Sequence, residues 1–337
     1  MSALLRRSLI GVGLGVVIYA VAIIWFDAAS VRSALAEFSW WVFPLALLAS
    51  TLNYGLRFIK WELCLGWLEI RAEGEGNAPE LSRGRSLLIY LAGLSMSVSP
   101  GKVGEVLRSV LLKASDGVAF SRTAPIVVAD RATDLIALVL LSLVGVSEYR
   151  ELLPWVVATM VLVTIGVVVL GSPRLFGPLM ALGARLPAVG GLFTKAEAMV
   201  DASERVLRLP RLVPLTILSL LGWGLECIGY WLILNAFGDF DASLRLCAFA
   251  WSATTIVGAL TFLPGGLGAT ELSLGALVPR IALGATQAVA VASTLLIRVA
   301  TLWYAVILGG VCLAWFLRDP KLRKAAREAQ AARDEGV

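Results

Sequence analysis

The sequence contains no histidine among its 337 residues. Chemistry that depends on an imidazole is therefore excluded, including His-based acid–base catalysis, phosphohistidine intermediates and His-ligated metals. Cysteine is also scarce, and the four cysteines stand singly in apolar segments without paired spacing. Neither a disulfide framework nor a thiolate metal site is expected, and small buried side chains are the simpler interpretation.

Charged residues are also scarce in this sequence. Only 16% of the residues are charged, whereas 58% are hydrophobic and the mean hydropathy is +0.84. A soluble domain of this length carries far more charge, so the composition predicts an integral membrane protein without a large soluble domain. The net charge is a modest +5, and the basic residues gather in loops and in the tail. This placement indicates cytoplasmic faces near anionic lipid rather than nucleic-acid binding.

The apolar windows predict an all-α, polytopic fold with about six full transmembrane helices. Each window is about as long as the ~20 residues that a helix needs to cross the hydrocarbon core. Two further segments break at Pro-Gly pairs and are predicted to be re-entrant helical hairpins, which enter the membrane and return to the same side. The predicted spans are 8–26, 40–62, 123–145, 153–171, 212–235 and 286–317, and the predicted hairpins are 86–113 and 245–280.

The distribution of Lys and Arg predicts the orientation, with both the N-terminus and the C-terminus in the cytoplasm. A single membrane domain, 1–337, is then organised as a first half, 1–171, and a second half, 212–317. A cytoplasmic amphipathic connection, 172–211, joins the halves, and a basic cytoplasmic tail, 318–337, follows them. In this topology the two hairpins open from opposite faces of the membrane. Such inverted repeats are typical of transporters.

The two predicted hairpins carry nearly the same sequence at their breaks. Helix breakers and charges are costly in lipid unless the backbone is shielded by protein or faces a wet cavity. Their repetition indicates a midplane site between two halves, although Pro-Gly pairs also recur by chance and a structural turn is the alternative. The repeated positions are Pro100, Gly101, Lys102, Gly104 and Glu105 in the first hairpin, and Pro264, Gly265, Gly266, Gly268 and Glu271 in the second.

Charged residues near the first break favour an anionic ligand. Lys102 stands where freed amides and a helix N-terminus gather, which is a favourable place for a phosphate or a carboxylate. Arg108 lies three positions after Glu105, so the two can pair on one helix face. With Lys102 and Arg108 close together, an anionic headgroup is the natural ligand.

A third charged group interrupts the helix predicted at 123–145. Asp130, Arg131 and Asp134 comprise two acids and one base, and a buried ion without a partner is costly. A further basic partner is therefore expected, and an acid left without a firm partner could carry a coupled proton. Static ion pairing is the competing account. The candidate partners are Arg57, Arg108 and Arg298.

The remaining candidates are less specific. Arg57 and Lys60 share one helix face and form either a cationic wall of a cavity or a pair that snorkels to cytoplasmic headgroups. Glu226 is an isolated acid in an apolar helix, and Arg298 faces Glu271 from the following helix. For these residues, too, the alternative is an ion pair that only fixes helix packing.

In these motifs the chain resembles the lysylphosphatidylglycerol synthase transmembrane-region family, a flippase-like membrane module. Members show a Pro-x-(Arg/Lys)-x-Gly-Glu-x-x-Arg signature, which runs here from Pro100 to Arg108. An acid-Arg-x-x-Asp signature follows at Asp130, with Asp where Glu is usual, and a late Pro-Gly-Gly-x-Gly-x-x-Glu signature begins at Pro264. Arg57 and Trp61 also fit the family pattern.

The resemblance implies a multi-pass protein of the bacterial inner (cytoplasmic) membrane that handles lipids. In the fused enzymes this region is associated with moving aminoacylated phosphatidylglycerol between leaflets. The aminoacyl-transferase domain of those enzymes is absent from this sequence, so lysine transfer is not expected. Stand-alone relatives are linked to polyprenyl-phosphate glycan pathways and to phospholipid handling, which leaves the substrate open.

Residues and resemblance together predict a flippase-like transporter rather than an enzyme. It would move an anionic phospholipid or a polyprenyl-phosphate-linked lipid between leaflets, with the headgroup held by the basic residues and hairpin amides. No metal, cofactor or nucleic acid is expected, and the partner is a membrane lipid. A homo-oligomer or a biosynthetic enzyme partner stays open. The alternative functions are an intramembrane enzyme and an accessory scaffold in a lipid or lipid-linked glycan biosynthesis pathway.

Overall fold

The computed structural model describes residues 28–70, 81–99, 104–146, 205–238, 241–261 and 263–318, together with five positions between 154 and 165. Every secondary-structure element in these ranges is helical, so the all-α prediction is confirmed for them. The helices are α2 (Ala28–Glu37), η1 (Trp40–Val42), α3 (Phe43–Trp67), α4 (Arg83–Gly93), η2 (Leu94–Met96), α5 (Gly104–Asp116), α6 (Phe120–Val146), α10 (Leu209–Asn235), α11 (Leu244–Leu260), η6 (Pro264–Gly266), α12 (Ala269–Ile281), α13 (Gln287–Arg298), η7 (Val299–Trp303) and α14 (Tyr304–Phe316).

Three continuous helical segments in the described ranges are long and apolar enough to cross a membrane: Trp40–Trp67, Leu209–Asn235 and Gln287–Phe316. They correspond to three of the predicted spans. A further predicted span, 123–145, corresponds to α6, which has 27 residues and carries the charged residues Asp130, Arg131 and Asp134. The predicted span 8–26 lies outside the described residues, as does nearly all of 153–171.

The outer surfaces of the long helices are apolar. On α10 a stripe of exposed side chains recurs about every fourth residue, which is the spacing of one helix face. A helix of a soluble protein places polar side chains on such a face, whereas a membrane helix presents apolar ones to lipid. The stripe consists of Leu209, Val213, Ile217, Leu221 and Ile228.

Short polar residues fix where several helices begin. The Ser82 hydroxyl accepts a hydrogen bond from the Arg85 amide at the start of α4, and Ser243 does the same for Leu246 at the start of α11. Thr286 caps α13 in the same way. Such caps satisfy amides that have no partner within the helix.

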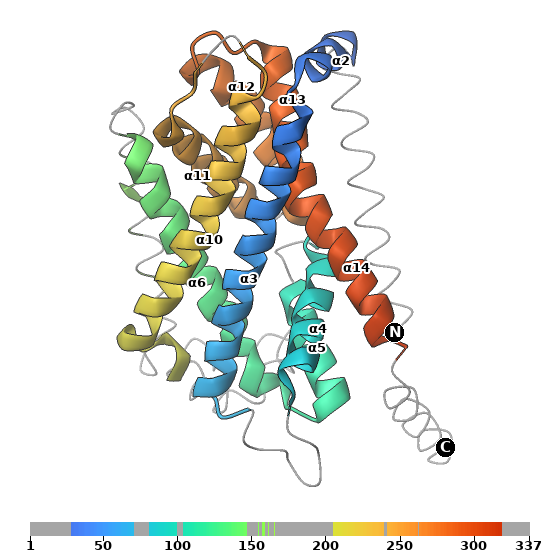
Figure 1. Ribbon diagram of the computed structural model, residues 1–337. Helices are drawn as coiled ribbons and strands as arrows, with labels where there is room; N and C mark the ends of the chain where they lie inside the picture. The colour runs from blue at the N-terminus through green and yellow to red at the C-terminus, as the bar shows by residue number, and fades with distance from the viewer. Residues whose placement is uncertain are drawn as a thin grey trace, which may run out of the picture.

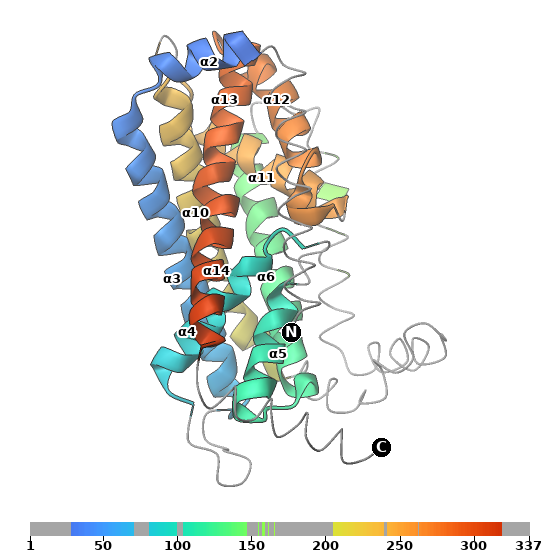
Figure 2. The same cartoon turned by 90° about the vertical axis from the view of Figure 1, so that its right-hand side faces the viewer.

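Two helix pairs occupy opposite halves of the bundle. α3, α10 and the continuous rod formed by α13, η7 and α14 run along its height, whereas α4 and α5 lie in the lower half and α11 and α12 in the upper half (Figures 1 and 2). The upper part of the rod, α13, packs against α12, and its lower part, α14, packs against α4 and η2. One helix therefore contacts both pairs.

The rod changes its winding where these two contacts meet. Residues Val299–Trp303 form a π-helical turn, which is wider than an α-helical turn. The Tyr54 hydroxyl of α3 donates a hydrogen bond of 2.5 Å to the carbonyl of Thr301 within this turn. π-Helical turns of this kind are frequent at functional sites.

The breaks in the two helix pairs meet at the level of this turn. Val98, which follows η2, packs with Leu267 and Leu302. Gly265 adopts a φ of +60°, and a Cβ atom there would lie 3.3 Å from the Cα of Val98. Both the positive φ and the close approach favour glycine at this position. The turn at Pro100 lies outside the described residues.

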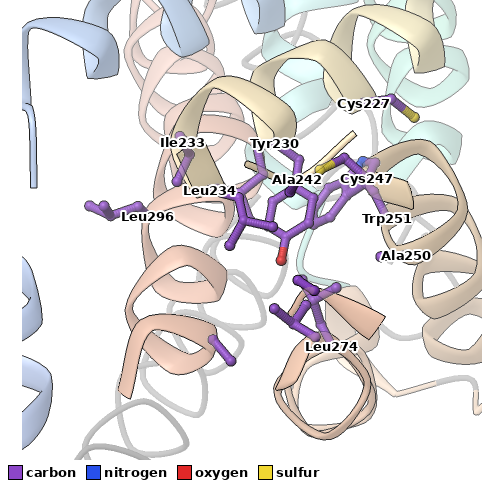
Figure 3. Packing of buried hydrophobic residues seen from close by; sticks show 14 of the residues in the cluster. Cys227, Tyr230, Ile233, Leu234, Ala242, Cys247, Ala250, Trp251, Leu274 and Leu296 are labelled. Carbon is purple, nitrogen blue, oxygen red and sulfur yellow. The ribbon is translucent and has the colours of Figure 1, made fainter. Parts of the chain in front are cut away.

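The upper half has a dense core. Trp251 of α11 stacks on Tyr230 of α10 with a distance of 5.8 Å between ring centroids. Figure 3 shows these rings packed among side chains from α10, α11 and neighbouring helices, with Leu274 of α12 nearby. This core fixes the position of α11 relative to α10 and so positions one wall of the cavity described below.

Gly309 provides a test of how tightly α14 contacts η2. A Cβ atom at Gly309 would lie 2.1 Å from the backbone nitrogen of Ser95, whereas one at the neighbouring Gly310 would meet nothing within 4 Å. We expect Gly309→Ala to lower the free energy of unfolding by about 1–3 kcal/mol, the usual cost of overpacking, and Gly310→Ala to leave it unchanged or raise it by up to about 1 kcal/mol, because alanine is the better helix former. Thermal unfolding of the two variants in detergent measures the difference. Equal melting temperatures would contradict the close contact.

Candidate functional site: a charged cavity between the two helix breaks

The centre of the site is a pair of aspartates on α6 that share one lysine. The Nζ atom of Lys60 lies 2.9 Å from Oδ1 of Asp130 and 3.2 Å from Oδ1 of Asp134. The side chain of Lys60 is fully buried. The interpretation that Lys60 snorkels to the headgroups is therefore wrong, because α3 turns this side chain toward α6 instead.

Three arginines from three helices complete the cluster. Arg57 of α3 forms an ion pair with Asp134, and Nη2 of Arg131 lies 3.5 Å from the same carboxylate. Nη1 of Arg108, from α5, lies 3.5 Å from Asp130. Four basic side chains thus surround two carboxylates in the described part of the chain, which reverses the expected excess of acid on α6.

Neutral groups hold the cluster in place. Ser219 of α10 accepts a hydrogen bond of 2.7 Å from Lys60 and donates one of 2.9 Å to Asp134. The guanidinium of Arg57 lies 5.5 Å from the ring centroid of Trp223. That of Arg108 lies 4.1 Å from the ring centroid of Tyr90. Aromatic faces attract guanidinium groups and restrict their orientation, so both arginines are preorganised.

A second ion pair fixes the break between α11 and α12. Nε of Arg298 lies 2.7 Å from Oε1 of Glu271, and Nη2 of Arg298 donates a hydrogen bond of 2.6 Å to the carbonyl of Gly265. Oε2 of Glu271 accepts a hydrogen bond of 2.7 Å from the amide of Gly268, which is the first residue of the turn into α12. Arg298 therefore ties the break to the end of α13.

Glu226 forms a separate acidic position on α10. Its Oε1 atom accepts a hydrogen bond of 2.6 Å from the Asn53 amide, and its Oε2 atom accepts one of 3.2 Å from the Trp251 indole. Neutral donors from α3 and α11 thus hold this carboxylate in a fixed orientation.

These groups surround a cavity of about 390 Å³ between the two helix breaks. Charged residues from both halves of the chain line it, and aromatic and aliphatic side chains form most of the remaining wall. No group of three Asp, Glu, Cys or His side chains converges as metal ligands within the described ranges. The charged residues that line the cavity are Arg57, Arg108, Arg131, Asp134, Glu226 and Arg298.

The geometry divides the predicted site residues into three sets. The six charged residues named above line the cavity, together with Gly265 and Gly266. The second set, Lys60, Asp130, Pro264, Gly268 and Glu271, is not among the lining residues. In this set, Lys60, Asp130 and Glu271 support the wall through ion pairs. Pro100, Gly101 and Lys102 lie outside the described residues, and only the helical backbone of Gly104 and Glu105 is described.

Several residues of the site were missed by the sequence analysis. Asn53 and Ser219 hold carboxylates, and Tyr54, Trp223 and Trp251 line the cavity. Asn53 and Ser219 are polar residues within apolar helices, and this is a weak signal because such residues often bond their own backbone.

Comparison with known proteins places the chain in a family. The sequence profile of the lysylphosphatidylglycerol synthase TM region matches residues 12–309. The chain belongs to this family. The resemblance predicted from the three motifs is thereby confirmed, and the matched region contains every residue of the cavity.

Two relatives of this lysylphosphatidylglycerol synthase TM family come from Methanothermobacter thermautotrophicus, and both are named UPF0104 membrane protein. One is 23% identical over 315 residues, covering 88% of this chain and 90% of the relative. The other is 25% identical over 252 residues, covering 68% of this chain and 74% of the relative. Family membership and the apolar helices together identify a multi-pass membrane protein.

Proposed function

We propose that this protein is a lipid translocase that moves an anionic phospholipid or a polyprenyl-phosphate-linked lipid between the leaflets of the inner membrane. The observation that carries the proposal is the cavity between the two helix breaks, where arginines from both halves converge. A phosphate bound there would compensate the excess of basic over acidic side chains around Asp130 and Asp134. Family membership supports a role connected with lipids.

In this proposal α4–α5 and α11–α12 are re-entrant hairpins from opposite faces of the membrane, and both termini lie in the cytoplasm. The pair α4–α5 and the pair α11–α12 lie in opposite halves of the bundle, which supports the proposed arrangement of the hairpins (Figure 2). Rocking of one half against the other would expose the cavity to each leaflet in turn. No covalent bond is made or broken in this process. It consists of headgroup binding, the rocking motion and headgroup release.

Arg131 is the residue best suited to bind the headgroup directly. It lines the cavity, and with 28% exposure its side chain is more accessible than the other three bases of the cluster. Asp134 also contacts Arg57, Lys60 and Ser219. Removal of the Arg131 charge therefore leaves the buried carboxylate paired.

We expect Arg131→Gln to slow leaflet exchange of a fluorescent phosphatidylglycerol in liposomes by about tenfold or more. A hydrogen bond to a charged group contributes about 1.5–3 kcal/mol, and 1.4 kcal/mol corresponds to a factor of ten. Arg280→Gln is the matched control, because Arg280 is an exposed arginine on α12 outside the cavity. If wild-type protein exchanges the lipid no faster than empty liposomes, or if both variants match wild type, the proposal is wrong.

A further inference from the structure

The cavity has an opening at the end of α11. Three residues there, Ala259, Leu260 and Leu263, line the cavity and are also exposed on the surface of the bundle. Leu260 is 53% exposed and Leu263 is 44% exposed. A side chain that belongs to both a cavity wall and the outer surface lies at the mouth of that cavity. This mouth is apolar, whereas Arg108 and Arg131 line other parts of the same cavity.

The mouth lies beside α11 and not between α11 and α12. At Gly258 a Cβ atom would lie only 2.1 Å from Oγ1 of Thr270, so the two helices are in close contact there. Leu135 and Leu138 of α6 line the same cavity, and α6 packs along α11. The mouth is therefore bounded by the end of α11, with α6 on the neighbouring wall.

The position of the mouth along the height of the bundle determines whether it faces acyl chains, headgroups or water. Leu263 precedes the break at Gly265, which contacts Leu302 near the middle of the 30-residue rod Gln287–Phe316. At 1.5 Å per residue the rod is about 45 Å long, so the mouth is roughly 20 Å from either end. Half of a hydrocarbon core is about 15 Å thick. The mouth thus opens onto acyl chains rather than onto water or headgroups.

From this geometry we propose that the mouth is a lateral portal for the hydrocarbon chain of a lipid phosphate. The inference rests on the proposed function and adds the source of the ligand, a lipid that enters from within the bilayer. Leu260 and Leu263 contact the first methylene groups of the chain while the phosphate lies against Arg108, Arg131 and Arg298. A water-soluble anion cannot use this portal, because it would first have to cross hydrocarbon.

The first test narrows the portal with large side chains. In the double variant Leu260→Trp/Leu263→Trp we expect leaflet exchange of fluorescent phosphatidylglycerol to fall about tenfold or more. The matched control is Leu272→Trp on α12, because Leu272 is 61% exposed but does not line the cavity. This control should exchange lipid at the wild-type rate, and both variants should melt near the wild-type temperature. If the double variant exchanges lipid as fast as Leu272→Trp, the portal is disproved while the translocase proposal stands.

A second measurement judges the portal even if wild-type protein moves no lipid. A photo-crosslinking phenylalanine analogue at position 263 should label phosphatidylglycerol in preference to phosphatidylcholine, at least fivefold, and Arg131→Gln should abolish the preference. The same analogue at position 272 should label both lipids equally, and millimolar glycerol phosphate should not compete at either position. Selective labelling without exchange would refute the translocase and retain the portal. Unselective labelling at 263, or competition by glycerol phosphate, would refute the portal.

Discussion

Replacement of Asp130 by alanine is expected to lower the free energy of unfolding by about 3–5 kcal/mol. Asp130 is buried and lies 2.9 Å from Lys60 and 3.5 Å from Arg108. Without Asp130, Arg108 loses this carboxylate and Lys60 keeps only the Asp134 carboxylate, so buried positive charge is less well compensated and its desolvation is the penalty. Thermal and denaturant unfolding in detergent measure the loss.

A second variant tests whether charge imbalance causes this loss. In Asp130→Leu/Lys60→Met both charges are replaced by apolar groups of similar size, and part of the lost stability should return, while Arg108 still lacks its carboxylate. Arg205→Ala serves as a control, because Arg205 and Glu69 form an exposed pair at 4.0 Å that should contribute less than about 1 kcal/mol. If Asp130→Ala costs no more than Arg205→Ala, the network does not stabilise the fold.

Replacement of Arg298 by methionine is expected to release the break between α11 and α12. The change removes the 2.7 Å contact with Glu271 and the 2.6 Å hydrogen bond to the Gly265 carbonyl. We expect a loss of about 3–5 kcal/mol, because a partly buried carboxylate loses its guanidinium partner and keeps the neutral Gly268 amide as a donor. Hydrogen–deuterium exchange of a peptide covering 264–272 should accelerate about tenfold or more, with little change in peptides from α3.

Arg298→Lys is the matched control for geometry. Lysine keeps the positive charge but lacks the planar group that reaches both the carboxylate and the backbone carbonyl. It should restore part of the stability and leave exchange in 264–272 intermediate between wild type and Arg298→Met. Identical exchange in all three proteins would contradict the role of Arg298 in fixing the break.

Hydrophobic length was the most informative part of the sequence. The span predicted at 286–317 corresponds to the rod Gln287–Phe316, and the span predicted at 212–235 lies within α10. Such segments are predictable because the thickness of the bilayer fixes the number of apolar residues that a helix needs. A second general rule, the cost of burying a charge without a partner, led to the expectation that basic residues would pair with Asp130 and Asp134.

The rotation of each helix about its axis could not be predicted. Lys60 could have faced headgroups or the interior, and only the packing of α3 against α10 and α6 turns it inward. Nor could the two roles of charged residues in apolar helices be distinguished from the sequence. Arg108 lines the cavity, whereas Asp130 is not among the lining residues and supports the wall. Asn53 and Ser219 carry no charge, so their role emerged only from the contacts.

The π-helical turn at Val299–Trp303 gives α14 a lever arm. Above it α13 is tied to the second break by Arg298, and below it α14 contacts η2 through Gly309. α14 has 13 residues, so it extends about 20 Å from the turn. A bend of about 10° at the turn would carry the far end of α14 sideways by roughly 3 Å, together with the α4 surface against it. A small local adjustment beside the cavity would thereby be magnified into a displacement of about 3 Å at the far end of α14.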